Sequence, residues 1–226
     1  MTQLILAALF FVGLHFGIAG TSLRDRGIEK IGEKTYRAAF SILSLLGLFW
    51  LIHAYPKAGY VETWGQLLWF KHFAALLMLA AFLFAVLGIT SANPTAVGGE
   101  KLLAADAPAT GIMRITRHPF LWGVAIWAFT HLLVNGDLAA LILFGSMLVL
   151  VLGGMVSIDA KRRRTMGEHW DHFAAVTSVI PFMAIREGRN RLVWKEIKWW
   201  QPVLALLVYA AVMHFHMKLF GVSPLF

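Results

Sequence analysis

FLWGVAIWAFTHLLV (120–134), NGD (135–137) and LAALILFGSMLVLVLGGMVSI (138–158) are the consecutive segments that decide the fold. The two outer segments are almost wholly apolar, and a helix of about 20 such residues crosses the hydrocarbon core of a bilayer. Because only three residues separate them, the two segments are predicted to form a tight helical hairpin. The chain is therefore expected to lie in a membrane.

Composition extends this conclusion to the whole chain. Hydrophobic residues make up 59% of the 226 residues and charged residues 14%, whereas soluble domains are about half apolar and about a quarter charged. Four further apolar runs bring the predicted spans to six, and these runs are 4–19, 38–54, 67–89 and 203–220. We predict an all-α integral membrane protein with about six transmembrane helices, in a single domain over residues 1–226.

Lysine and arginine are unevenly distributed between the spans. Seventeen of the twenty lie in residues 21–37, 90–118 and 158–199. The positive-inside rule therefore places these segments in the cytoplasm and both termini in the periplasm of a bacterial inner membrane. The net charge of +8 is attributed to this topology and to contact with anionic membrane lipids. A nucleic-acid partner is not expected, because the basic residues form no soluble face.

One predicted helix is too short and too polar to cross the membrane. Residues 165–180 mix charged and aromatic side chains, which is typical of an amphipathic helix on the cytoplasmic surface, here stopped near Pro181. His169 and His172 are interpreted as part of its solvated face. The basic run 161–164 is interpreted as an anchor for lipid headgroups.

The histidines are the first candidate site. Six of the nine fall within apolar runs, namely His15, His53, His72, His131, His214 and His216. Any one of them could be an interhelical hydrogen-bonding group, but six together favour a shared site for haem or another transition metal. The rise of a helix places His53, His72, His131 and His214 toward the outer side, where they could converge, and His15 nearer the cytoplasm. The chain has no cysteine, which excludes thiolate-bound haem, iron–sulfur clusters and disulfides.

A second candidate site lies on the cytoplasmic side. Arg114, Arg117 and His118 precede the fourth span, and Asp159 and the basic run 161–164 follow the fifth. The predicted hairpin brings these two sets beside each other. Arginine side chains here could bind carboxylates, a nucleotide or a phosphorylated headgroup.

Several stretches of the chain resemble the NnrU family and its plant and cyanobacterial branch, the 15-cis-zeta-carotene isomerases. The resemblance runs from about residue 8 to residue 220, and its motifs are LHFGIAGTSLRDR (14–26), GEKTYR (32–37), GIMRITRHP (111–119), WAFTH (127–131) and TSVIPFMAI (177–185). It implies a haem b protein in which His15 and His131 are the axial ligands. It also implies a redox-dependent cis–trans isomerisation of a polyene such as 15-cis-zeta-carotene.

Further site residues follow from this reading. Arg114, Arg117 and His118 are expected to contact the cofactor. The two arginines would form ion pairs with its carboxylates. His53, His72 and His214 are reserve candidates for the iron. The isomerases have a cysteine three residues before the second histidine, whereas this chain has Ala128, so a switch to a thiolate ligand is not expected.

Other functions remain open at this point. The NnrU name associates relatives with nitrogen-oxide metabolism. In that case the protein would bind a small gaseous ligand in place of a polyene. The tract Arg117 to Gly123, with Gly167, Trp170, Phe173 and Pro181, is also similar to membrane methyltransferases that bind S-adenosylmethionine. In those enzymes a glutamate pair stands where this chain has Ile158 and Asp159. A non-catalytic partner that assembles a reductase is a further alternative.

Overall fold

The computed structural model describes residues 1–19, 21–96, 98–104 and 109–225. These residues form helices and connecting loops, with an isolated antiparallel bridge between Glu62 and Asp137 and no β-strand within the described ranges. The α-helices are α1 (Thr2–Gly13), α2 (Ser22–Ile31), α3 (Glu33–Ala54), α4 (Lys71–Thr90), α5 (Pro119–Asn135), α6 (Leu138–Met166), α7 (Glu168–Val176), α8 (Met183–Arg186) and α9 (Trp200–Phe220). A π-helical turn, η1 (Leu14–Ala19), continues α1, and short 3-10 turns are η2 (Leu68–Phe70), η3 (Glu100–Ala104), η4 (Gly111–Arg114) and η5 (Trp194–Glu196).

The prediction of a helical membrane protein is confirmed. Among the described residues, five helical segments are long and apolar enough to cross a membrane, namely Thr2–Ala19, Glu33–Ala54, Leu68–Thr90, Leu138–Met166 and Trp200–Phe220. The remaining predicted span corresponds to α5, an apolar helix of 17 residues. The count of six spans and the sidedness of the termini stay predictions.

The chain divides into two compact units. Unit 1 contains residues 1–68 and 128–150, and unit 2 contains residues 69–127 and 151–226. The division passes through α5 and α6, so each of these helices contributes to both units. The prediction of one domain over the whole chain stays a prediction.

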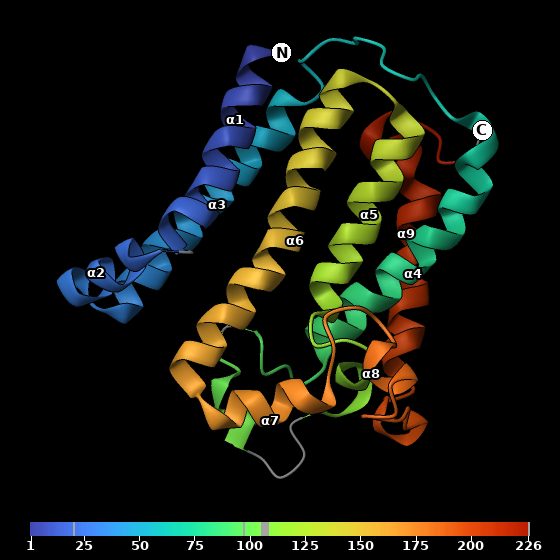
Figure 1. Ribbon diagram of the computed structural model, residues 1–226. Coiled ribbons are helices and arrows are strands. Elements are labelled where there is room, and N and C mark those ends of the chain that lie inside the picture. Colours follow the sequence, from blue (N-terminus) through green and yellow to red (C-terminus); the bar gives the residue numbers. More distant parts are fainter. Residues whose placement is uncertain (20, 97, 105–108, 226) are drawn as a thin grey trace. The chain divides into compact units, whose positions relative to one another are not determined.

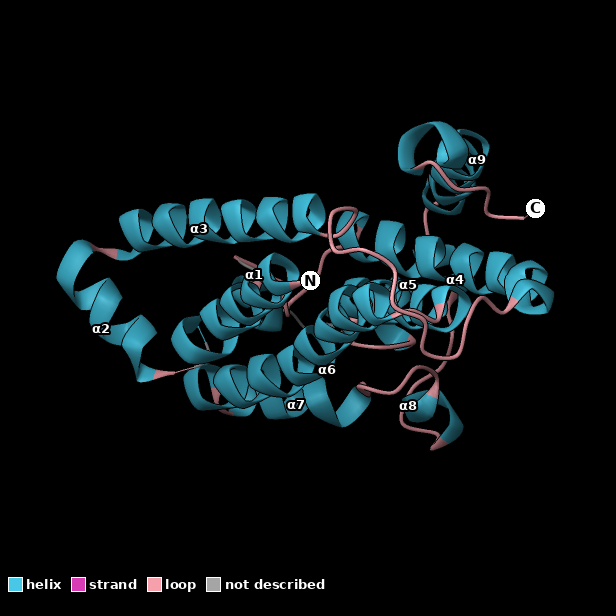
Figure 2. Ribbon diagram, turned by 90° about the horizontal axis from the view of Figure 1, so that it is seen from above, coloured by secondary structure: helices cyan, strands magenta, loops and turns pink. Residues whose placement is uncertain are grey.

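In unit 1, α1 and α3 pack side by side in opposite directions, and α2 connects them at one end (Figures 1 and 2). Gly47 of α3 makes this approach possible, because a Cβ atom added there would lie 3.0 Å from the ring of Phe10. The packing positions the end of α1, and the π-helical turn that follows it, against α3.

The turn between α5 and α6 is also fixed within unit 1. The carbonyl oxygen of Gly136 accepts bonds from the backbone N–H groups of Thr63, Trp64 and Gly65, at 2.9, 3.2 and 3.0 Å, and from the Thr63 hydroxyl at 2.6 Å. Asp137 then caps α6, since its carboxylate accepts from the backbone N–H of Ala140 at 2.9 Å. The predicted tight hairpin is confirmed.

Gly136 should therefore tolerate no side chain. Its φ of +59° is left-handed, and an added Cβ would lie 1.9 Å from the carbonyl oxygen of Gly65. We expect Gly136→Val to destabilise the protein by about 3 kcal/mol or more, since strain and lost hydrogen bonds act together. Gly145→Ala is the matched control, because nothing lies within 4 Å of its added Cβ. Thermal unfolding in detergent measures both, and equal midpoints would contradict this account of the turn.

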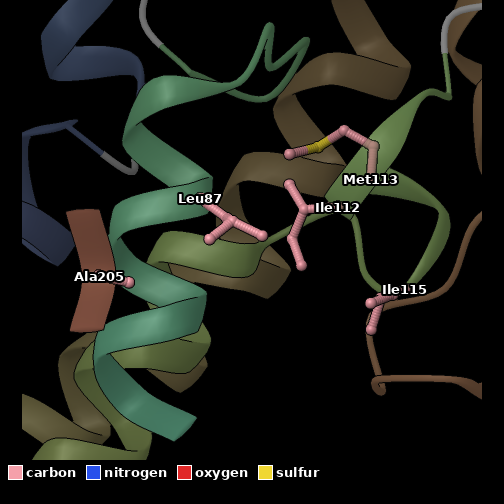
Figure 3. Packing of buried hydrophobic residues seen from close by; sticks show 5 residues of the cluster. All are labelled: Leu87, Ile112, Met113, Ile115 and Ala205. Atoms are coloured by element: carbon pink, nitrogen blue, oxygen red, sulfur yellow. The ribbon is translucent and has the colours of Figure 1, made fainter. Parts of the chain in front are cut away.

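In unit 2, α9 packs antiparallel to α4. Gln201 near the start of α9 donates to the hydroxyls of Thr90 and Ser91 at the end of α4, at 3.0 and 3.1 Å. Tyr209, two turns later, donates to the carbonyl of Ala75 at 3.1 Å. The adjacent apolar cluster joins both helices to η4 and the residue that follows it, and its buried members are Leu87, Ile112, Met113, Ile115 and Ala205 (Figure 3).

Three boundaries differ from those predicted. Residues 22–31 are helical (α2) where a loop was expected, and α6 continues to Met166, beyond the predicted end at residue 158. The amphipathic helix predicted over 165–180 is shorter, because α7 ends at Val176. The segment that follows α7 pairs with the tract before α5. The backbone N–H of Arg117 donates to the carbonyl oxygen of Ser178 at 3.0 Å, and the backbone N–H of Phe182 donates to that of Ile115 at 2.8 Å.

Candidate functional site

The predicted site residues fall into two groups. His15 and His131 belong to unit 1, and Arg114, Arg117 and His118 belong to unit 2.

His15 lies on the π-helical turn η1, immediately after α1. Interruptions of this kind are rare and occur frequently at functional sites. Its Nδ1 is 2.7 Å from the carbonyl oxygen of Phe11, which fixes Nδ1 as the protonated nitrogen. The Nε2 atom, which has no hydrogen-bond partner among the described residues, therefore carries the lone pair. A backbone carbonyl on Nδ1 is the usual arrangement for a histidine that binds a metal through Nε2.

Aromatic rings surround the His15 imidazole. The ring centroid of Phe11 lies 4.6 Å away, and that of Phe40 of α3 lies 5.3 Å away in an edge-on arrangement. These contacts orient the imidazole and leave it half-buried.

His131 lies on α5 within unit 1 and is also half-buried. Its ring stacks on Phe144 of α6, with centroids 5.0 Å apart and an angle of 30° between the planes. Ala128, three residues earlier, is fully buried. A methyl group at this position cannot bind a metal.

Unit 1 also contains buried hydroxyl groups without partners. Among the described residues, four buried side-chain polar atoms make no hydrogen bond, and three of them are the hydroxyls of Tyr36, Ser44 and Thr130. Tyr36 and Ser44 lie on α3, four residues either side of Phe40, and Thr130 directly precedes His131. The fourth is Nδ1 of His118 in unit 2. Because unsatisfied buried groups are uncommon in native proteins, the three hydroxyls of unit 1 are candidate partners for polar atoms of a ligand.

In unit 2, Arg117, His118 and Asp159 form one buried group, which we call the Asp159 cluster. One carboxylate oxygen of Asp159 accepts from Nε and Nη2 of Arg117 at 2.8 and 2.6 Å, and the other is 2.7 Å from Nε2 of His118. The His118 side chain is fully buried, and those of Arg117 and Asp159 are 14% and 17% exposed. The guanidinium of Arg117 also lies over the ring of Trp170, 5.7 Å from its centroid. The prediction that the hairpin brings these two segments together is confirmed.

Arg114 forms a second ion pair, with Glu196 of η5. Nε and Nη2 of Arg114 donate to the two carboxylate oxygens at 2.6 and 2.7 Å, and Nη1 donates to the side chain of Asn190 at 2.7 Å. The backbone N–H of Gly111 donates to the same carboxylate at 2.7 Å. The hydrogen bonds from Arg114 lower the pKa of Glu196 and, in turn, raise the pKa of Arg114; burial opposes both effects.

The lowered pKa of Glu196 predicts a specific acid dependence. Its stabilising contribution is complete above the unfolded-state value of about 4.3 and is lost as pH falls through the folded-state value. We expect Glu196→Gln to cost about 1 kcal/mol at neutral pH, since the pair is partly exposed. The difference from the wild type should vanish in acid. Unfolding midpoints measured across pH test this, and a difference independent of pH would contradict it.

These pairs change the expected roles of the two arginines. Both were expected to pair with carboxylates of a cofactor, but carboxylates of the chain itself already bind both guanidinium groups. In the structure, these ion pairs join the tract 111–118 to α6 and to η5. The interpretation of the run 161–164 as a headgroup anchor was also wrong for Arg162, which is buried and donates to the carbonyl of Ala96 at 2.7 Å.

The other predicted ligands show no comparable setting. His53, His72 and His214 are exposed, and Nε2 of His53 is 2.7 Å from the ammonium of Lys57. Within the described ranges, no three His, Cys, Asp or Glu side chains come together to hold a metal ion. His53 and His131 belong to unit 1 and His72 and His214 to unit 2, so the convergence of the outer histidines stays a prediction. His169 and His172 are exposed as predicted.

Sequence reasoning did not identify Glu196, Asn190, Tyr36 or Ser44. Glu196 and Asn190 lie more than 70 positions from Arg114, and no local pattern predicts such pairing. For Tyr36 there was a signal, because it belongs to the motif GEKTYR at 32–37.

Together, the apolar helices and the half-buried histidine on a π-helical turn define a polytopic membrane protein with a candidate cofactor site in unit 1. The NnrU protein family matches residues 3–224. The chain belongs to the NnrU family, as its motifs indicated.

Two curated relatives are similar over most of this chain. The chloroplastic 15-cis-zeta-carotene isomerase of Zea mays is 32% identical over 199 residues, which cover 84% of this chain and 52% of that protein. The chloroplastic enzyme of the same name from Arabidopsis thaliana is 31% identical, with the same coverage. The chain thus spans about half the length of these relatives. No solved structure matches it.

Proposed function

We propose that the protein is a haem b-dependent membrane isomerase that acts on a cis double bond of a polyene such as 15-cis-zeta-carotene. Two relatives bear the name of this activity. The observation that carries the proposal is His15, whose Nδ1 is held by Phe11 and whose Nε2 is thereby prepared to bind a metal.

The residues of unit 1 fit haem b. Porphyrin itself supplies four nitrogen ligands, so the protein needs to contribute at most two, and His15 and His131 are suitable imidazoles. Phe11, Phe40 and Phe144 provide the apolar surroundings that a porphyrin requires. The unpartnered hydroxyls of Tyr36, Ser44 and Thr130 provide donors for its polar atoms.

The chain orients the reactants and excludes water. When bound, haem would be held by His15 and His131 and would supply redox-active iron chemistry that assists rotation about the central double bond. The carbonyl of Phe11 keeps the proton of His15 on Nδ1. Phe40 and Phe144 restrict the two imidazole rings, and buried Ala128 contributes no competing ligand.

Conversion of a defined polyene tests this function. Purified protein is supplied with haemin in liposomes that contain 15-cis-zeta-carotene. After reduction it should convert the central double bond of the polyene from cis to trans, and the oxidised protein should be inactive. Carbon monoxide should bind the reduced protein, since Ala128 offers no replacement ligand. If the reduced protein binds carbon monoxide or nitric oxide but leaves the polyene unchanged, the alternative role in nitrogen-oxide metabolism is favoured. If it does neither, catalysis at the haem is excluded.

The geometry gives the methyltransferase alternative less support. The residues that it requires for S-adenosylmethionine, Arg117 and His118, are bound to Asp159 in the described structure. Binding of S-adenosylmethionine to the purified protein would restore this alternative.

We propose that both termini face the periplasm of a bacterial cytoplasmic membrane, on the positive-inside distribution of the seventeen basic residues. A reporter that is active only in the periplasm should give signal when fused after Phe226 and none when fused within 160–195. The reverse pattern would contradict this orientation.

A further inference from the structure

Tyr36 stacks on Phe40, which contacts the His15 ring, and Arg24 lies on the face of α2 that covers Tyr36. From these positions we infer that Tyr36 and Arg24 anchor the acidic edge of the molecule that His15 binds. This inference rests on the proposed function, because it assigns the contacts of a haem carboxylate. It concerns unit 1 alone.

The first observation is how serine and threonine hydroxyls in and beside helices behave elsewhere in the chain. Helical serine and threonine hydroxyls usually donate to a carbonyl one turn earlier. Five hydroxyls here do so over three or four residues, namely Thr21, Thr90, Ser146, Thr165 and Thr177. Ser44 is half-buried, but its hydroxyl is buried and makes no such bond. The phenol of Tyr36 also finds no partner among the described residues. These two groups therefore point to a partner outside the chain.

The second observation is their common face on α3. Tyr36, Phe40 and Ser44 are spaced four residues apart, so they lie one above another. The ring of Tyr36 stacks with that of Phe40 at 6.2 Å, and Phe40 contacts the edge of His15 at 5.3 Å. Both hydroxyls thus lie on the side of α3 that carries the His15 contact.

The third observation is a positive charge at the Tyr36 end. α2 covers the Tyr36 ring, since a Cβ added to Gly27 would lie 2.9 Å from it, and Arg24 lies three residues before Gly27, on the same face of α2. Arg24 is half-buried, with its side chain 21% exposed. Its partner is the neighbouring carboxylate of Asp25, which is 53% exposed. Exposed pairs of this kind contribute little, so Arg24 can exchange Asp25 for a buried anion.

The chemistry of the ligand edge follows from these positions. A phenol donor beside a guanidinium suits a carboxylate, because charge-assisted hydrogen bonds are the stronger kind. Tyr36 lies in the first turn of α3, near the expected membrane surface, whereas Ser44 lies about 12 Å further along the helix. A flat amphiphile with its acidic edge at the surface and its apolar body within the bilayer matches this gradient. Haem b, with two carboxylates on one edge, is such a molecule.

Titration with two forms of the cofactor tests the anchor. Apo-protein in detergent is titrated with haemin and with haemin dimethyl ester, which lacks the acidic groups, and the Soret absorbance reports binding. Tyr36→Phe and Arg24→Gln are each expected to weaken haemin binding by about 10-fold to 100-fold and to leave ester binding unchanged. The controls are Tyr60→Phe and Arg26→Gln, because both residues are exposed; they should bind haemin like the wild type.

Each outcome has a defined meaning. Ester binding equal to the wild type shows that a variant is folded, so a selective loss of haemin supports the anchor. Wild-type haemin affinity in both Tyr36→Phe and Arg24→Gln would overturn the anchor while leaving the haem site intact. Wild-type protein that binds neither form would overturn the proposed haem function itself.

Discussion

Asp159→Ala is expected to destabilise the protein by about 3–5 kcal/mol, because it leaves a largely buried guanidinium uncompensated and a buried imidazole without its hydrogen-bond partner. Asp159 is the shared acceptor of Arg117 and His118. Without it, a guanidinium that is only 14% exposed and a fully buried imidazole lose their carboxylate. The tract before α5 would then separate from α6.

Thermal unfolding of the detergent-solubilised protein measures this effect. Asp171→Ala is the matched control, because Asp171 pairs with Arg163 at 3.2 Å with both side chains more than 60% exposed. Its removal should change stability by less than about 0.5 kcal/mol. Similar losses in the two variants would show that the Asp159 cluster stabilises no more than a surface pair.

His15→Ala and His131→Ala should each remove most of the bound haem or leave a five-coordinate iron. Each change deletes one imidazole, and one remaining axial ligand leaves a vacant position. The absorption spectrum at equal protein concentration measures both occupancy and coordination.

His53→Ala is the control for this pair of variants, because His53 is exposed at the end of α3 and contacts Lys57. It should keep the wild-type spectrum. Unchanged spectra in His15→Ala and His131→Ala would end their assignment, and loss in His53→Ala would move it to the outer histidines.

The sequence predicted most of what hydrophobicity controls. The apolar runs located the spans, and the three-residue gap at 135–137 predicted the hairpin that brings Asp159 to Arg117. The length of a hydrophobic run indicates only the part of a helix that lies within the hydrocarbon core. It therefore did not reveal that α6 continues through polar residues to Met166.

Long-range polar pairing was beyond the sequence. Arg114 was expected to pair with a cofactor carboxylate. Its actual partner, Glu196, lies 82 residues away, and no local pattern in the sequence indicates that pairing. Arg162 looked like its exposed neighbours, yet it is buried on the carbonyls of Thr95 and Ala96. Charge alone does not tell whether an arginine faces lipid headgroups or the backbone of its own chain.

The π-helical turn at His15 illustrates the same limit at short range. The motif at 14–26 indicated that His15 is functional, but no propensity predicts the wider turn at Leu14–Ala19 or the bond from Nδ1 to Phe11. That bond decides which nitrogen is available to a metal. It is therefore a property of the fold that the motif alone does not specify.

The most direct test of the central claim is the low-temperature electron paramagnetic resonance spectrum of the oxidised protein after it is loaded with haemin. Two imidazole ligands, from His15 and His131, should give a low-spin ferric signal typical of bis-histidine coordination. A purely high-spin signal, or no protein-bound ferric haem under saturating haemin, would contradict it.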